Sequence, residues 1–389
     1  MSKMNKPTQI TLTRYLYIKD EVFHSLVLSL LDKKDINCVL FWTYELYYSG
    51  YEEELFRYIR RIYFDFYALL HPKFYTFIDK QIHNWRETKD DTIVGYIMKN
   101  LFIMRYSHTI FSIRQLVLHR DKCNRTYKGR KPKWLIPYKE VYHSLLRSIR
   151  DKEYVDIYYH ISKLHGDDLK YCLHDVGKYL DNENIEKIPS EFYDDFEVSY
   201  ENMTYSDVAH IWFTTIVHLM KYENVDENKK VLHIKLTKDE IDLVMKTENE
   251  ICSPLYKTLE FKRMYAIHDK VSYFKNDRDS FPNMINKYSF MDEIQHRWLY
   301  YASTCPRYAE ILNTYDDVVV NHDKRCVEFK DDDDFENFYE NHGYFEPDEQ
   351  TGVTQQKVFH YDSQNNDVNN FINEPKLSIS FDVSYRFVY

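Results

Sequence analysis

The sequence predicts a mainly α-helical protein, built from a helical module that occurs twice and a smaller α+β C-terminal part. Three observations support this fold class. Two segments, one near position 21 and one near position 140, are closely similar and carry the same helical pattern. Apolar residues recur at helical spacing through most of the first 225 positions. Beyond residue 230, patterns that alternate in the manner of β-strands appear beside helical ones.

The duplication is clearest where EVFHSLVLSLLDK at 21–33 matches EVYHSLLRSIRDK at 140–152, with eight of thirteen positions identical. Both copies place apolar residues on one face of an α-helix. With small gaps the match continues through a second helix, where Glu45 pairs with Lys163, to a turn glycine, Gly50 or Gly166. We therefore expect 21–66 and 140–180 to fold as similar three-helix units.

The third helix of each copy carries an apolar stripe at spacings of three and four residues, which predicts one buried face. In the first copy the stripe consists of Leu55, Tyr58, Ile59, Ile62 and Phe66, and in the second of Leu169, Cys172, Leu173, Val176 and Leu180.

The sequence HDVGK at 174–178 lies on that third helix and matches the metal-binding pair of HD-domain phosphohydrolases. A catalytic pair must point into the interior of a helical bundle, whereas a rotation of 100° per residue places His174 and Asp175 off the apolar stripe. The pattern favours a polar helix surface. A metal-dependent phosphohydrolase, with His143 as a third ligand, stays the alternative.

The remaining elements follow from the same patterns and from turn and capping signals. Helices are expected at 20–33, 36–48, 52–68, 73–86, 91–105 and 108–119, a second helical block at 138–225, a strand near 231–235, a capping box at Thr237 and Glu240, two short helices around Pro306, a hairpin at 318–320 and 326–329, an acidic loop-rich stretch at 330–356 and a strand at 376–389. The expected domains are a first helical module at 8–119, a basic linker at 120–136, a second module at 137–226 and the α+β part at 227–389.

Composition and charge exclude several classes of function. The chain has 7 glycines in 389 residues and contains neither a P-loop nor a dinucleotide-binding fingerprint, so no nucleotide cofactor is expected. Its six cysteines form no CxxC pair, which favours a reducing compartment over a disulfide framework. We expect no secretion signal and no membrane span, because the N-terminus lacks an apolar core and no apolar run reaches 18 residues.

Charge is distributed unevenly along the chain. Residues 1–150 carry 26 Lys and Arg against 15 Asp and Glu, a balance of +11 that leaves −21 for the other 239 residues. The basic excess peaks in one segment with interleaved aromatic residues, for which contact with nucleic-acid phosphates is one interpretation. Its candidate residues are Arg120, Lys122, Arg125, Lys128, Arg130, Lys131, Lys133 and Trp134. The other interpretation is a solvated linker, or one that docks on the acidic C-terminal part.

Two resemblances add an expected origin. The segment WTYELYYSG at 42–50, the P-x-F at 72–74 and WLYYASTCPRYAEIL at 298–312 resemble an uncharacterised protein family of nucleocytoplasmic large DNA viruses. The segment HSLLRSIRDKEYVDIYYHISKL at 143–164 is similar to the helical C-terminal module of RarA-type ATPases, which assembles oligomers on DNA. The ATPase part of those proteins has no counterpart here, so the second resemblance implies an assembly role and no reaction.

Together these observations predict a non-enzymatic helical scaffold or assembly protein of a large DNA virus. Its expected partners are viral or host proteins, a second copy of itself and nucleic acid; no membrane, small-molecule substrate, metal or cofactor is expected. The expected location is the virus factory in the host cytoplasm, or the interior of the virion.

Overall fold

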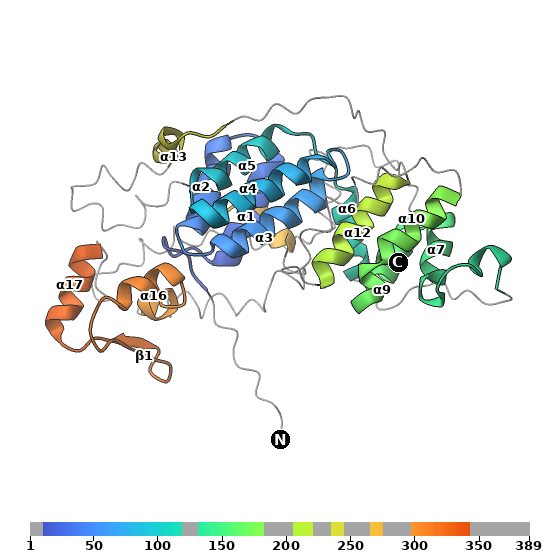
Figure 1. Ribbon diagram of the computed structural model, residues 1–389. Coiled ribbons are helices and arrows are strands. Elements are labelled where there is room, and N and C mark those ends of the chain that lie inside the picture. Colours follow the sequence, from blue (N-terminus) through green and yellow to red (C-terminus); the bar gives the residue numbers. More distant parts are fainter. Residues whose placement is uncertain are drawn as a thin grey trace, which may run out of the picture. The chain divides into compact units, whose positions relative to one another are not determined.

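The computed structural model describes residues 11–118, 131–182, 205–220, 235–244, 265–274 and 297–342, which form a mainly helical fold with a small antiparallel sheet (Figure 1). The predicted fold class is confirmed. In the first half of the chain the elements are α1 (Lys19–Asp32), α2 (Ile36–Tyr47), α3 (Glu52–Ile62), η1 (Tyr63–Tyr67), α4 (Phe74–Thr88), α5 (Thr92–Ile103) and α6 (Thr109–Leu118). They are followed by η2 (Lys133–Leu135), η3 (Glu140–Tyr142), α7 (His143–Arg150), α8 (Tyr154–Ile161), α9 (Gly166–Lys170), α10 (Cys172–Asn182) and α12 (Tyr205–Leu219). The C-terminal elements are α13 (Lys238–Val244), η7 (Asp269–Phe274), α16 (Pro306–Leu312), β1 (Val319–Asn321), β2 (Cys326–Glu328) and α17 (Asp332–His342).

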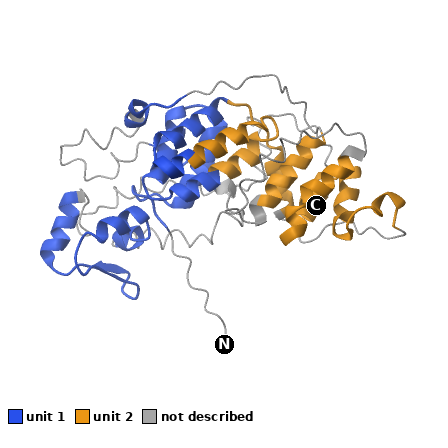
Figure 2. Ribbon diagram, in the orientation of Figure 1, with its two compact units in different colours: residues 1–58, 84–103, 233–377 blue, residues 59–83, 104–232, 378–389 orange. Residues whose placement is uncertain are grey.

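The chain forms two compact units that are discontinuous in sequence (Figure 2). Unit 1 comprises residues 1–58, 84–103 and 233–377, and unit 2 comprises 59–83, 104–232 and 378–389. Helices α3 and α4 contribute residues to both units. Each unit therefore combines segments that are far apart along the chain.

The core of unit 1 is a helical layer in which α1 packs on α2 and α2 packs on α5. The approach of α2 and α5 is close: a Cβ atom added to Gly95 would lie 2.4 Å from the Tyr44 hydroxyl oxygen. That hydroxyl donates to the backbone oxygen of Asp91 at 3.0 Å. Trp85 packs on Phe56 with 4.4 Å between ring centroids, which adds aromatic contact area to the same core.

Unit 2 has its core where α6 and α12 both pack on α8, and where α7 packs on α8 as well. The third helix of the second module is held by backbone acceptors at its start. Trp212 of α12 donates from its indole nitrogen to the Leu169 carbonyl at 2.8 Å, and the Tyr142 hydroxyl donates to the Asp168 carbonyl at 2.6 Å.

The two predicted modules share details of their backbone. Lys33 and Lys152, which are matched in sequence, both follow their first helix in the left-handed region, with φ values of 51° and 56°. The matched turn glycines Gly50 and Gly166 also have positive φ, at 86° and 55°. A difference lies in the third helix, which is interrupted at Tyr171 in the second module only. Superposition and common origin of the modules stay predictions.

The predicted helices of the first half match the structure to within a few residues. The segment expected as one helix at 52–68 changes character: α3 ends at Ile62, and η1 continues it as a π-helical turn. There the amide of Ala68 donates to the carbonyl of Tyr63, five residues back, at 2.8 Å. Such turns are uncommon and often lie at positions with a special role.

The C-terminal predictions have mixed outcomes. The capping box at α13 is confirmed: the Thr237 amide donates to Glu240 Oε2 at 2.9 Å, while Thr237 Oγ1 accepts from the Glu240 amide at 3.4 Å. Helical residues at 297–302 precede α16, and β1 pairs antiparallel with β2, as expected.

The acidic stretch was expected to be loop-rich, and this is wrong for its first part, which is α17. Asp331 Oδ1 accepts the Asp334 amide at 3.0 Å and so satisfies a donor at the helix start. Acidic residues in a first helical turn also favour the helix dipole. Phe338 and Tyr339 of α17 are buried.

The strand expected near 231–235 lies outside the described residues except for Lys235, which is not in a strand, and the strand at 376–389 lies outside them entirely. None of the described helices combines the length and the apolar character needed to cross a membrane.

Candidate functional site

The basic segment is described only at its end. Arg120, Lys122, Arg125, Lys128 and Arg130 lie outside the described residues. Lys131 and Lys133 are exposed on either side of Pro132, where the short helix η2 begins. These two ammonium groups are accessible to an anionic partner.

Trp134, the aromatic residue expected to stack on a base, already has partners within unit 2. Its ring lies 5.4 Å from that of Tyr179 on α10, centroid to centroid, and the guanidinium of Arg150 lies 5.1 Å from its centroid. The side chain is half-buried. Trp134 therefore fixes the end of the basic segment to the second module, with Arg150 of α7 over its ring.

The HD pair lies on the outer side of α10. The five residues of the stripe that includes Leu169 and Leu180 are all buried. His174 by contrast has 64% of its side chain exposed, and its Nδ1 lies 3.7 Å from Asp175 Oδ1. Among the described residues, no three His, Cys, Asp or Glu side chains come together as metal ligands would.

His143, the third ligand of the alternative interpretation, has a backbone partner instead. It is 9% exposed, and its Nε2 lies 2.9 Å from the Tyr138 carbonyl. The matched His24 of the first module is also buried, with Nδ1 2.5 Å from the Asp20 carbonyl. Both matched histidines thus contact a backbone carbonyl upstream, that of Asp20 in the first turn of α1 and that of Tyr138 before α7.

A buried ionic cluster in unit 2 was not anticipated. Asp65, in the π-helical turn η1, accepts two hydrogen bonds from Arg114 of α6: Nε donates to Oδ1 at 3.0 Å and one terminal nitrogen to Oδ2 at 2.9 Å. His210 of α12 places Nε2 3.1 Å from Asp65 Oδ1. All three residues are 3–5% exposed.

In this cluster the negative charge of Asp65 faces the positive charge of Arg114. Burial would raise the pKa of the Asp65 carboxyl, but the charge of Arg114 and the hydrogen bond to His210 hold it below its usual value. The carboxylate is thus kept ionised in the interior, where it joins η1, α6 and α12. Its signal in the sequence was a single acidic residue within the aromatic run YFDFY. The distant partners of Asp65 gave no local signal.

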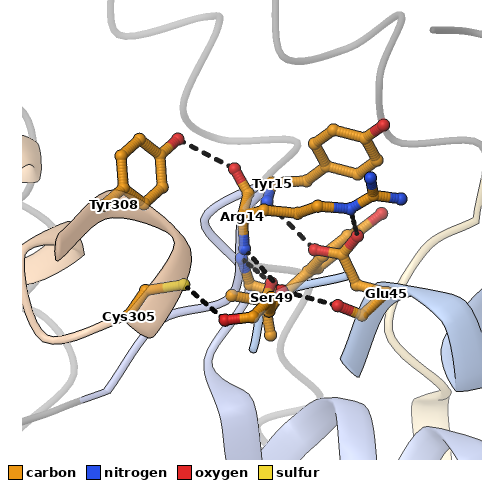
Figure 3. A network of polar contacts seen from close by, with 8 residues as sticks. Arg14, Tyr15, Glu45, Ser49, Cys305 and Tyr308 are labelled. Atoms are coloured by element: carbon orange, nitrogen blue, oxygen red, sulfur yellow. Dashed lines mark hydrogen bonds and ion pairs between the residues drawn. The ribbon is translucent and has the colours of Figure 1, made fainter. Parts of the chain in front are cut away.

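Unit 1 contains a second buried network, which we call the polar hub: Arg14, Tyr15, Glu45, Ser49, Cys305 and Tyr308 (Figure 3). Glu45 has a fully buried side chain and accepts from Arg14 Nε at 3.1 Å and from the Tyr15 amide at 3.0 Å. The Tyr308 hydroxyl donates to the Arg14 carbonyl at 2.8 Å. The hub therefore links the N-terminal segment, α2 and α16.

The polar hub brings together two of the segments on which the viral resemblance rests, 42–50 and 298–312. The Ser49 carbonyl accepts from the Arg307 amide and from the Cys305 thiol, each at 3.3 Å. Ser49 Oγ accepts from the Arg14 amide at 2.8 Å. Gly50 follows with φ +86°, and a Cβ atom there would lie 2.6 Å from that of Pro306. The hub residues of these two segments therefore stabilise the fold of unit 1.

Comparison of the chain with protein-family models, with curated proteins and with solved structures finds no match. Any proposal about function therefore rests on the geometry of the described residues. Its main features are two buried ionic networks that join distant segments and an exposed basic edge beside Trp134.

Proposed function

We propose that this chain is a non-enzymatic helical scaffold or assembly protein of a large DNA virus that contacts nucleic acid through the basic segment 120–133. It would work in the virus factory of the host cytoplasm or in the interior of the virion. Its partners would be viral or host proteins and further copies of the chain.

The observation that carries the assembly part is the role of the buried charges. Glu45 with Arg14, and Asp65 with Arg114, are buried in pairs that join segments far apart in sequence. Buried ion pairs of this kind contribute little net stability over apolar packing. We propose that in this chain they select one arrangement of the distant segments that they join. A fixed framework of this type suits a protein whose work is to hold partners in place.

The observation that supports nucleic-acid contact is the exposure of Lys131 and Lys133 beside the anchored Trp134. Phosphate contacts by lysine release counterions, so the affinity falls as salt rises, with a log–log slope of about −0.9 for each phosphate neutralised on duplex DNA.

The test is binding of the full-length chain to single-stranded and duplex DNA and to RNA over a salt series from about 50 mM upward. We expect Lys131→Ala and Lys133→Ala each to reduce the slope by about one unit. Lys163→Ala, on an exposed residue of the same module, serves as the matched control and leaves the slope unchanged. Absence of binding at about 50 mM salt would remove the nucleic-acid part and leave an assembly role that rests on protein partners.

A further inference from the structure

A segment of unit 1, residues 265–274, lies on the first module and is held there by Tyr265. The Tyr17 hydroxyl donates to the Tyr265 carbonyl at 2.6 Å. The Tyr265 ring lies 5.2 Å from that of Phe41 on α2, and its own hydroxyl donates to Asp35 Oδ2 at 3.1 Å. One aromatic side chain of the segment is thus recognised by an apolar neighbour and by a carboxylate.

The second anchor of the segment is His268, three residues further on. Its backbone amide donates to Ser25 Oγ of α1 at 3.0 Å, and its Nε2 lies 3.2 Å from Asp32 Oδ2. The hydrogen bond from His268 lowers the pKa of the Asp32 carboxyl to about 2. The helix η7 follows and packs against α1. The first module therefore acts as a receptor for a Tyr-x-x-His segment.

The second module keeps this chemistry at the matched positions of α7. In the pairing of 21–33 with 140–152, Ser25 corresponds to Ser144 and Asp32 to Asp151, both identical in type. The hydroxyl that accepts the histidine amide and the carboxylate that faces its imidazole are thus both present in the second copy.

The groups that recognise the tyrosine are also represented. After one extra residue in the first copy, Asp35 before α2 pairs with Glu153 before α8. The same register pairs Phe41 with the aromatic Tyr159. We name the matched set in the second module, Ser144, Asp151, Glu153 and Tyr159, together with Ile136 just before that module, the open face. Counting back from the matched helices without a gap places Ile136 at the position of Tyr17.

The two faces differ in exposure. Tyr17, Ser25 and Phe41 are 0–2% exposed under the segment of unit 1. Beside the second module Ile136 is 67% exposed, and within it Asp151 is exposed while Ser144 and Tyr159 are half-buried. The ammonium of Lys163 lies 5.4 Å from the centroid of the Tyr159 ring. Covering an isoleucine that has two thirds of its surface in water removes apolar area from the solvent, and this favours binding of a partner.

We propose that the open face of the second module binds a short segment of a partner protein that carries tyrosine and, three residues later, histidine. The seated segment of the first module shows the mode: a backbone amide to Ser144, an imidazole to Asp151, and the tyrosine against Tyr159 and Glu153. This inference rests on the proposed assembly function and names the type of partner that the scaffold recruits.

The test uses the chain's own segment as probe. A fluorescent peptide of residues 262–275, KRMYAIHDKVSYFK, is titrated with the full-length chain, in which the matching face of the first module is occupied. We expect saturable binding that weakens about tenfold for Ser144→Ala and for Asp151→Ala, which corresponds to about 1.4 kcal/mol. A peptide with Tyr265→Ala and His268→Ala should lose binding, and Lys170→Ala, on an exposed residue of α9, should leave it unchanged.

Ile136→Asp provides an independent variant, because its side chain is exposed and the change does not disturb the core. It should also weaken binding. The proposal is overturned if no peptide binds up to about 1 mM, or if the open-face variants bind the peptide as the unmodified chain does. It is also overturned if the chain forms dimers that dissociate in these variants, since the occupant is then a second copy. The salt dependence of nucleic-acid binding, measured on the same variants, separates failure here from failure of the proposed function.

Discussion

The two modules have similar sequences and matching turns, yet the same turn has different neighbours in each. Both copies turn through a left-handed lysine, Lys33 or Lys152, and through a positive-φ glycine, Gly50 or Gly166. At Gly50 an added Cβ would lie 2.6 Å from the Cβ of Pro306, whereas at Gly166 none of the residues that the structure describes lies within 4 Å of that position.

This difference shows which features are local. A helix end and a turn depend on residues next to one another in the chain, so similar sequences produce them twice. Whether the finished module is covered depends on segments that arrive from elsewhere. The first module is covered by residues 265–274 and contacts α16 at its turn. Ile136 beside the second module is exposed, and the described part of the chain leaves the Gly166 turn uncovered.

The largest expected effect comes from the matched pair Glu45 and Lys163. Glu45→Ala leaves Arg14 and the Tyr15 amide without their buried acceptor and should cost about 3–5 kcal/mol in the free energy of unfolding. Lys163→Ala removes an exposed side chain and should change it by less than about 0.5 kcal/mol. Urea unfolding of both variants measures the difference; equal losses would show that the polar hub does not distinguish the modules.

The turn glycines sharpen the comparison at a smaller scale. Gly166→Ala introduces only the left-handed backbone penalty, about 1–2 kcal/mol. Gly50→Ala adds a collision with Pro306, and overpacking of this kind costs about 1–3 kcal/mol more. Thermal melting of the two variants should rank Gly50→Ala as clearly less stable. A reversed ranking would mean that α16 does not pack on the turn of the first module.

The smallest expected effect is a pH dependence at the covered face. Because the hydrogen bond to His268 lowers the pKa of Asp32 from 3.8 to about 2, its contribution is complete above about pH 4. It is lost as the pH falls through about 2. Asp32 is half-buried, so we expect Asp32→Asn to cost only on the order of 1 kcal/mol at neutral pH. The difference from the unmodified chain, followed by denaturant unfolding, should vanish near pH 2; a constant difference would contradict the contact.

Much of the local structure could be predicted from the sequence. The helices of the first half, the capping box of Thr237 with Glu240 and the β1–β2 hairpin follow from periodicity and short-range hydrogen bonding, which a single stretch of chain contains. The same reasoning placed His174 off the buried stripe. It missed α17, since the run Asp331–Asp334 suggested a solvated loop while its N-terminal capping and the buried Phe338 stabilise a helix.

The sequence by itself determined the helices of the first half to within a few residues, the capping of α13 and the match between 21–33 and 140–152. Only the tertiary structure decided that Asp65 meets Arg114, 49 residues away, and that Glu45 and Ser49 meet the segment around Cys305. It also decided that residues 265–274 cover part of the first module, whereas Ile136 beside the second module is exposed. The physical reason is range: helix propensity and capping act over about four residues, whereas the burial of a charge or an apolar face depends on whichever distant segment packs against it.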